Sequence, residues 1–130
     1  MYKRQRKKYV QLTPEEWVRQ HFLHYLIGHL TYPKTLIRLE RALPHPSLRF
    51  RPDLVVYNRL AQPLMLVECK APNLPINNQE VWRQIGRYYA HCQARLLVMT
   101  NGIIHFCWQL DERRGNYDLL PTIPRFDGCV

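Results

Sequence analysis

Residues 51–70, RPDLVVYNRLAQPLMLVECK, decide the fold of this chain because they form two apolar runs joined by a polar loop. The first run starts at Asp53 and is rich in β-branched residues, and the second ends at Lys70. Residues 58–63 between them are polar and close with a proline, which is typical of the connection in a β-hairpin. Folding the hairpin brings Asp53, at the start of the first strand, across from Glu68 and Lys70 at the end of the second.

Charged side chains gather at one end of this predicted hairpin. Residues i and i+2 of a strand point to the same face, so Glu68 and Lys70 share one face while Cys69 points to the other. Asp53 adds a second carboxylate, and two neighbouring carboxylates repel each other unless a cation lies between them. Hard oxygen ligands with open water positions suit Mg²⁺ or Mn²⁺. The three residues therefore indicate metal-assisted hydrolysis of a phosphodiester, with Lys70 orienting or deprotonating the attacking water.

A simpler interpretation of the same residues is an ion pair at a strand end, with Asp53 capping a turn after Pro52. Two carboxylates and a lysine meet by accident in many sheets. The order of the elements around the hairpin helps to choose between the two interpretations.

Length and charge limit what the chain can do. Its 130 residues, 46% of them hydrophobic, suffice for one domain with a single core. The formal net charge of +9 favours polyanions, and nucleic acid is the commonest polyanion partner of a basic domain. We expect a basic arm over residues 1–12 and one domain over residues 13–130, with a core over residues 13–109 and an extension over residues 110–130.

The N-terminal arm concentrates positive charge between two tyrosines. Such an arm supplies salt-dependent contacts to phosphates, and its aromatic rings can stack on bases. The alternative is a solvated, partly disordered terminus that only aids solubility. The basic residues that we expect to bind nucleic acid here are Lys3, Arg4, Arg6, Lys7 and Lys8.

The expected location is the cytoplasm, with no membrane partner. No apolar segment follows the basic arm, which argues against a secretory signal. No run approaches the roughly 18 apolar residues of a membrane span. The four cysteines are scattered without a C-x-x-C pair, so we interpret them as reduced thiols, at least two of them small core residues.

Helices and strands are predicted on both sides of the hairpin. Thr13 is a candidate N-cap and Glu16 completes a capping box, which predicts a helix over residues 14–30. The C-terminal extension is rich in turns and prolines, so we expect it to lie on the surface and contribute little. The other predicted elements are a strand at 36–43, a helix at 79–91, and two strands at 95–100 and 103–109 joined by a tight turn at Asn101-Gly102.

This order, αβββαββ, is that of the restriction-endonuclease-like fold, an α/β fold with a mixed central sheet flanked by helices. The chain resembles the PD-(D/E)xK nuclease superfamily. Within it, residues 13–109 resemble the nuclease domain at the N-terminus of the R subunit of type I restriction enzymes. The matching stretches are Pro14-Glu15-Glu16-Trp17-Val18-Arg19-Gln20, Tyr32-Pro33, Arg51-Pro52-Asp53, Leu66-Val67-Glu68-Cys69-Lys70-Ala71-Pro72, Gln84-Ile85-Gly86-Arg87-Tyr88 and Thr100-Asn101-Gly102.

The resemblance implies a role for each residue of the predicted site. Asp53 and Glu68 would bind Mg²⁺ or Mn²⁺, and Lys70 would act on the attacking water. Glu16 on the first helix would be an accessory acidic residue near the metal. For that accessory role the capping box is a sufficient structural explanation of Glu16, and the neighbouring Glu15 and the more distant Glu40 are competing candidates.

Gln84 and Tyr88 match a Q-x-x-x-Y element that supports the nuclease site in these relatives. Their i, i+4 spacing puts both on one face of the predicted second helix. The alternative is that Tyr88 is a core residue and Gln84 bridges or caps. Arg83 and Arg87 on the same helix could contact phosphates.

The sequence contains no G-x-x-x-x-G-K-[ST] phosphate loop, so it encodes no ATP-driven motor. The predicted function is that of an Mg²⁺-dependent DNA endonuclease. Two alternatives stay open: a structure-specific nuclease similar to a dimeric Holliday-junction resolvase, and a non-catalytic DNA-binding domain. The expected partners are DNA and either restriction-modification subunits or a second copy of the chain.

Overall fold

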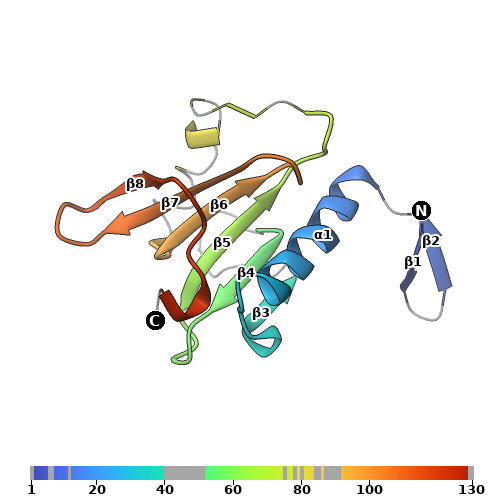
Figure 1. The fold of residues 1–130 in the computed structure, drawn as a ribbon, viewed down its shortest axis with the longest axis horizontal. Helices are drawn as coiled ribbons and strands as arrows, with labels where there is room; N and C mark the ends of the chain where they lie inside the picture. Colours follow the sequence, from blue (N-terminus) through green and yellow to red (C-terminus); the bar gives the residue numbers. More distant parts are fainter. Residues whose placement is uncertain are drawn as a thin grey trace.

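A mixed sheet of six strands forms the centre of the fold (Figure 1). The computed structural model describes residues 2–5, 8–11, 13–39, 52–74, 76–77, 79, 81–83, 86 and 92–128. The elements in chain order are β1 (Tyr2–Gln5), β2 (Lys8–Gln11), α1 (Pro14–Gly28), the 3-10 helix η1 (Lys34–Leu36), β3 (Ile37–Leu39), β4 (Leu54–Tyr57), β5 (Pro63–Cys69), β6 (Leu96–Thr100), β7 (His105–Asp111), β8 (Asn116–Leu120) and the 3-10 helix η2 (Phe126–Gly128).

The sheet keeps the order of its strands along the chain, β3-β4-β5-β6-β7-β8. β4 and β5 form the predicted antiparallel hairpin, in which Leu54 pairs with Val67. Among the strands described, β5 and β6 are the one parallel pair, with Val67 opposite Val98. Parallel neighbours need a long crossover connection. The chain between Cys69 and Leu96 supplies this crossover.

The predicted second helix falls in this crossover and lies largely outside the described residues. The parts that are described there, Gln79, residues 81–83 and Gly86, are helical. Val81 is buried against strand residues such as Leu66 and Leu97. The described part of the crossover around Val81 therefore packs on one face of the sheet.

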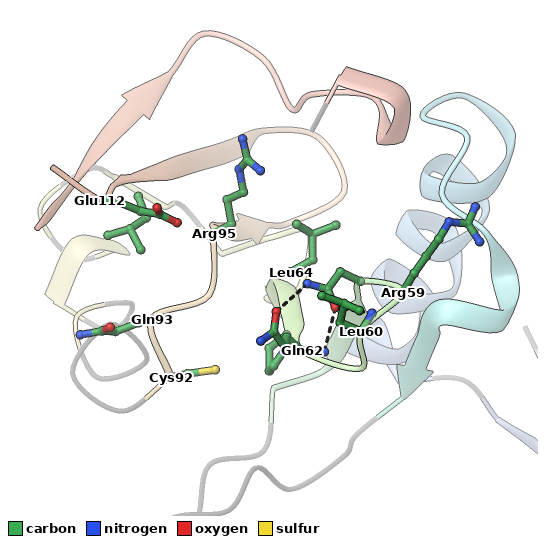
Figure 2. A pocket seen from close by; sticks show the side chains of 11 residues that line it. Arg59, Leu60, Gln62, Leu64, Cys92, Gln93, Arg95 and Glu112 are labelled. Atoms are coloured by element: carbon green, nitrogen blue, oxygen red, sulfur yellow. Dashed lines mark hydrogen bonds between the residues drawn. The ribbon is translucent and has the colours of Figure 1, made fainter. Parts of the chain in front are cut away.

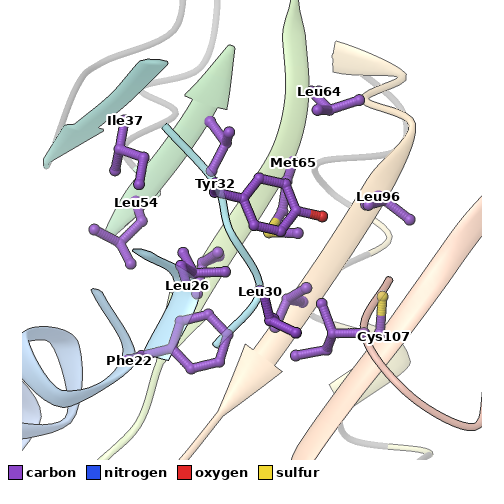
Figure 3. Packing of buried hydrophobic residues seen from close by; sticks show 14 of the residues in the cluster. Phe22, Leu26, Leu30, Tyr32, Ile37, Leu54, Leu64, Met65, Leu96 and Cys107 are labelled. Atoms are coloured by element: carbon purple, nitrogen blue, oxygen red, sulfur yellow. The ribbon is translucent and has the colours of Figure 1, made fainter. Parts of the chain in front are cut away.

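Helix α1 covers the opposite face, as Figure 3 shows for the residues packed there. Alternation along β5 explains why both faces are apolar: Met65, Val67 and Cys69 pack on the α1 side, and Leu66 packs on the other. A strand that is buried on both faces has a near-continuous apolar sequence, as β5 does. Burial of Cys69 and Cys107 confirms their interpretation as core residues.

The start of helix α1 agrees with its sequence signal. The backbone N–H of Glu16 donates a hydrogen bond to the Thr13 hydroxyl at 3.1 Å, and Pro14 occupies the first helical position. An N-cap hydroxyl satisfies a helix donor that has no partner within the helix.

Thr13→Ala is expected to lower the free energy of unfolding by about 1 kcal/mol because the Glu16 N–H loses its acceptor. Urea denaturation followed by circular dichroism measures the change. The matched control is Thr35→Ala, at an exposed threonine outside α1, which should change stability by less than half as much. Equal effects of the two substitutions would contradict the capping role.

The predicted order αβββαββ does not match the observed order, and the first difference lies at the N-terminus. The basic arm forms a two-stranded antiparallel sheet, β1-β2, in which Arg4 pairs with Tyr9. Figure 1 shows this hairpin apart from the six-stranded sheet. The sequences of the two strands, YKRQ and KYVQ, do not alternate between apolar and polar residues, so the sequence showed the charge of the arm but not its strands.

The second difference lies at the C-terminus, where the expectation of a surface extension that contributes little was wrong. β8 pairs with β7 along its whole length and forms an edge of the sheet. Ile123 and Phe126 are buried in the core beside α1. The Tyr32 hydroxyl donates to the Pro124 carbonyl at 2.7 Å, and the Phe126 N–H donates to the Leu30 carbonyl at 2.8 Å. The extension therefore closes the α1 side of the domain.

Smaller differences concern boundaries. The strand predicted at 36–43 begins at Ile37 after the 3-10 helix η1, and residues 40–43 lie outside the described part. β7 begins at His105 rather than at Ile103, because residues 101–104 form a loop.

In the described parts of the chain, no helix combines the length and the apolar character needed to cross a bilayer.

Candidate functional site

The structure brings Asp53 to the end of β5, as the hairpin predicted. Asp53 immediately precedes β4, and its Oδ2 accepts a hydrogen bond of 2.7 Å from the backbone N–H of Cys69. The register of Leu54 opposite Val67 puts Asp53 beside Glu68. The hydrogen bond to Cys69 fixes the Asp53 carboxylate where the two strands meet.

Glu68 and Lys70 lie together where β5 ends, at the same end of the sheet as Asp53. The Lys70 Nζ is 3.9 Å from Glu68 Oε1, and their side chains are 26% and 20% exposed, respectively. The Lys70 N–H donates to the Thr100 carbonyl at 2.8 Å, so the parallel pairing of β5 with β6 reaches this point. The backbone of this segment is therefore fixed by strand pairing, and both side chains are partly exposed to solvent.

Cys69 separates the two charged residues in sequence and points to the α1 side. Burial, together with the negative charges of Asp53 and Glu68, raises the pKa of the Cys69 thiol far above its ordinary value. A thiol with such a pKa stays protonated and unreactive. Cys69 is thus a core residue beneath the charged cluster rather than a nucleophile.

Arg19 on α1 is a buried charged residue that the sequence interpretation did not single out. Its guanidinium pairs with the Glu16 carboxylate, which also accepts a hydrogen bond of 3.2 Å from Gln20 Nε2. A Cβ at Gly102, in the loop after β6, would lie 3.5 Å from side-chain atoms of Trp17 and Val18, so the first turns of α1 lie near the ends of β5 and β6. The i, i+3 spacing of an acid and an arginine was the available signal. The accessory role of Glu16 stays a prediction.

Asn101 joins the loops that follow β5 and β6 through hydrogen bonds, a role that the prediction of a tight turn did not include. Its buried side chain accepts hydrogen bonds from the backbone N–H groups of Ile103 at 2.9 Å and Ile104 at 2.8 Å, and donates to the Leu74 carbonyl at 3.2 Å. Gly102 has a φ of 90°, which a glycine adopts without steric cost. The loops after β5 and β6 are thus joined beside Lys70.

The structure describes only some of the other residues predicted to belong to the site. Arg83 is exposed, whereas Gln84, Arg87 and Tyr88 lie outside the described residues. Of the basic arm, the backbones of Lys3, Arg4 and Lys8 lie in β1 and β2, while Arg6 and Lys7 lie outside the described residues.

The described residues contain no group of three or more His, Cys, Asp or Glu side chains that could hold a metal ion. At the end of β5 the described part of the chain offers two carboxylates, Asp53 and Glu68. Mg²⁺ is commonly bound by one or two carboxylates and keeps several waters, so a pair suits it better than it suits zinc.

A groove of about 690 Å³ lies at the other end of the sheet, where β5 begins (Figure 2). Arg59, Gln62, Arg95 and Glu112 are among the residues that line it. Because Asp53, Glu68 and Lys70 sit where β5 ends, this groove is separate from the charged cluster.

Comparisons with known proteins show a family match and a similarity to a solved structure. A family model described as "Type I restriction enzyme R protein N terminus (HSDR_N)" matches residues 14–124. The chain is also similar to a solved fragment from Vibrio vulnificus YJ016 described as an HsdR subunit of a type I restriction enzyme, with a TM-score of 0.60 and 19% sequence identity. That similarity covers 91% of this chain and 24% of that chain, about a quarter of its length, and at this identity it shows a shared fold. No curated protein matches the chain.

Proposed function

Because the chain belongs to the family of type I restriction enzyme R protein N-terminal domains, we propose that it is a metal-dependent DNA endonuclease domain with a restriction-endonuclease-like core. The observation that carries the proposal is the anchoring of Asp53 to the end of β5, beside Glu68 and Lys70. Two carboxylates and an amine are thereby grouped where β5 ends, and the Glu68 and Lys70 side chains are partly exposed. Lys70 and Glu68 are 3.9 Å apart and partly exposed, and an ion pair of this kind contributes little to stability. The arrangement therefore favours hydrolysis of a phosphodiester over a purely structural ion pair.

The donor set fits a hard divalent cation. Asp53 and Glu68 would hold Mg²⁺ or Mn²⁺ through carboxylate oxygens, with water completing the coordination. A bound ion of this kind polarises a phosphoryl oxygen and lowers the pKa of a coordinated water. Lys70 would orient the attacking water and offset negative charge on the phosphate as the bond to its leaving oxygen lengthens. Glu16 would act as the accessory acid, and Gln84 and Tyr88 would support the site.

DNA is the proposed substrate because the chain carries a formal net charge of +9. The basic residues of the β1-β2 hairpin, together with Arg83 and Arg87, would contact phosphates. The chain spans 24% of the solved fragment to which it is similar. Activity within a larger restriction-modification assembly is therefore part of the proposal, and the other subunits would select the target.

The proposal is tested by incubating the full chain with supercoiled plasmid, linear duplex and a four-way junction, each with Mg²⁺, Mn²⁺ or EDTA. Cleavage that needs both the metal and Lys70 is the expected result. Preference for the junction would favour the resolvase-like alternative. DNA binding with no cleavage under any condition would contradict catalysis and leave a non-catalytic binding domain.

Metal binding can be measured without DNA. Asp53→Asn is expected to weaken Mn²⁺ binding at least about tenfold, because the site loses one of its two carboxylates. Electron paramagnetic resonance of free Mn²⁺ gives the affinity, and Asp127→Asn, at an exposed aspartate near the C-terminus, is the control. Unchanged Mn²⁺ affinity in Asp53→Asn would contradict the ligand assignment.

A further inference from the structure

The first turns of helix α1 contain a buried ion pair. The Arg19 guanidinium pairs with Glu16 Oε2, and the two side chains are only 8% and 12% exposed, respectively. Side chains of a helix lean toward its N-terminus, so an arginine reaches the residue one turn earlier. The pair is therefore shielded from solvent on the face of α1 that packs on the sheet.

Stability alone does not explain this pair. Taking two charges out of water costs free energy that their attraction only partly returns, and apolar residues of similar volume often serve a buried position as well or better. The neighbours of Arg19 on this face, Val18 and Phe22, are such apolar core residues. A guanidinium at this position therefore points to a role beyond packing.

The Glu16 carboxylate is held at both of its oxygens. Arg19 binds Oε2, and Gln20 Nε2 donates a hydrogen bond of 3.2 Å to Oε1. The backbone of Glu16 is fixed as well, because its N–H donates to the Thr13 hydroxyl. The two side-chain bonds use part of the roughly four acceptor positions of a carboxylate. Glu16 is thus oriented and keeps the capacity to accept a hydrogen bond from water.

The oriented carboxylate belongs to a part of α1 that lies near the candidate site without joining its acidic pair. Val18 packs in the same core cluster as Cys69, the residue between Glu68 and Lys70. Glu16, Asp53 and Glu68 are all described, yet they do not form a group of three that could hold a metal ion. The geometry therefore favours a role for Glu16 outside the metal ligands.

Resting on the proposed function, we infer that Arg19 is a positioning residue that fixes Glu16 as a hydrogen-bond acceptor for water at the site and keeps it from becoming a third metal ligand. Asp53 and Glu68 hold the cation, and Lys70 acts on the attacking water. Arg19 acts only through Glu16. Its positive charge also offsets the third carboxylate, which would otherwise repel the other two.

The test combines two measurements on the full chain: the single-turnover rate of plasmid cleavage at saturating Mg²⁺, and the affinity for Mn²⁺ from electron paramagnetic resonance. Arg19→Met is expected to lower the rate at least about tenfold, because a catalytic group displaced by about 1 Å loses its alignment. The Mn²⁺ affinity of Arg19→Met should not fall, in contrast to that of Asp53→Asn, because no metal ligand is removed.

A double variant tests whether Arg19 acts through Glu16. Glu16→Gln alone and Glu16→Gln combined with Arg19→Met should cleave at the same rate, because residues that act as a unit are not additive. Independent roles would multiply the two losses. The control is Arg59→Met, at an exposed arginine that lines the groove at the other end of the sheet (Figure 2), which should cleave at the wild-type rate.

Arg19→Lys decides the question if the melting temperature shows that Arg19→Met is unfolded. A lysine keeps the positive charge but lacks the planar fork that orients a carboxylate. Its rate should therefore fall while folding and Mn²⁺ affinity persist.

The outcomes separate this inference from the proposed function. If the wild type cleaves DNA, three results would each overturn the inference alone: a wild-type rate in folded Arg19 variants, a loss of Mn²⁺ affinity equal to that of Asp53→Asn, or losses that multiply in the double variant. A wild-type chain that does not cut DNA would overturn the proposed function and, with it, this inference.

Discussion

Lys70→Ala is expected to reduce the rate of DNA cleavage by about a thousandfold, because the attacking water loses its positioning group and the phosphate loses a nearby positive charge. The Lys70 side chain is only partly buried, and its ammonium lies beside Glu68 rather than in the apolar core. The substitution should therefore leave folding intact. A large loss of rate at unchanged stability would separate a catalytic lysine from a structural one.

Plasmid cleavage in Mg²⁺ under single-turnover conditions measures this effect, with circular dichroism as the check on folding. The matched control is Lys34→Ala, at an exposed lysine in η1, which should leave the rate within about twofold of the wild type, the scale of a distant surface charge. A rate for Lys70→Ala equal to that of the control would contradict the role of Lys70.

Phe22→Ala is expected to lower the free energy of unfolding by about 3–5 kcal/mol, the cost of a large buried aromatic. Phe22 lies in the core between α1 and the sheet (Figure 3). Its ring is 5.9 Å from the ring of Tyr25 and 5.4 Å from that of His105. Removing the ring leaves a cavity between the helix and the strands that carry the site.

Urea denaturation monitored by tryptophan fluorescence measures this loss. Leu119→Ala, at an exposed leucine on the edge strand β8, is the control and should cost less than about 1 kcal/mol. Similar effects of Phe22→Ala and Leu119→Ala would show that α1 does not pack on the sheet as described.

The charged cluster could be predicted because it depends on local rules. Alternation along one strand puts Glu68 and Lys70 on one face, and antiparallel pairing brings Asp53 to them. The N-terminus of α1 was likewise predictable from Thr13 and Pro14, since capping depends on neighbouring residues.

Features that depend on distant partners could not be predicted. One missed feature was local instead: β8 pairs with β7 across the short turn at residues 112–115, but its sequence, NYDLL, gives only a weak strand signal. The burial of Phe126 follows from its packing beside α1, far away in sequence. The Asn101-Gly102 pair indicated a turn, but the bond from Asn101 to Leu74 joins two loops that only the parallel pairing of β5 and β6 brings together.

We propose that Asp53 and Glu68 together hold the metal ion used for DNA cleavage. The most direct measurement is the anomalous X-ray scattering of crystals of the chain grown with Mn²⁺. We expect one strong anomalous peak within about 2.2 Å of a carboxylate oxygen of each residue, close to the bond length of a hard divalent cation. A fully occupied peak elsewhere, or none between Asp53 and Glu68 at saturating Mn²⁺, would contradict it.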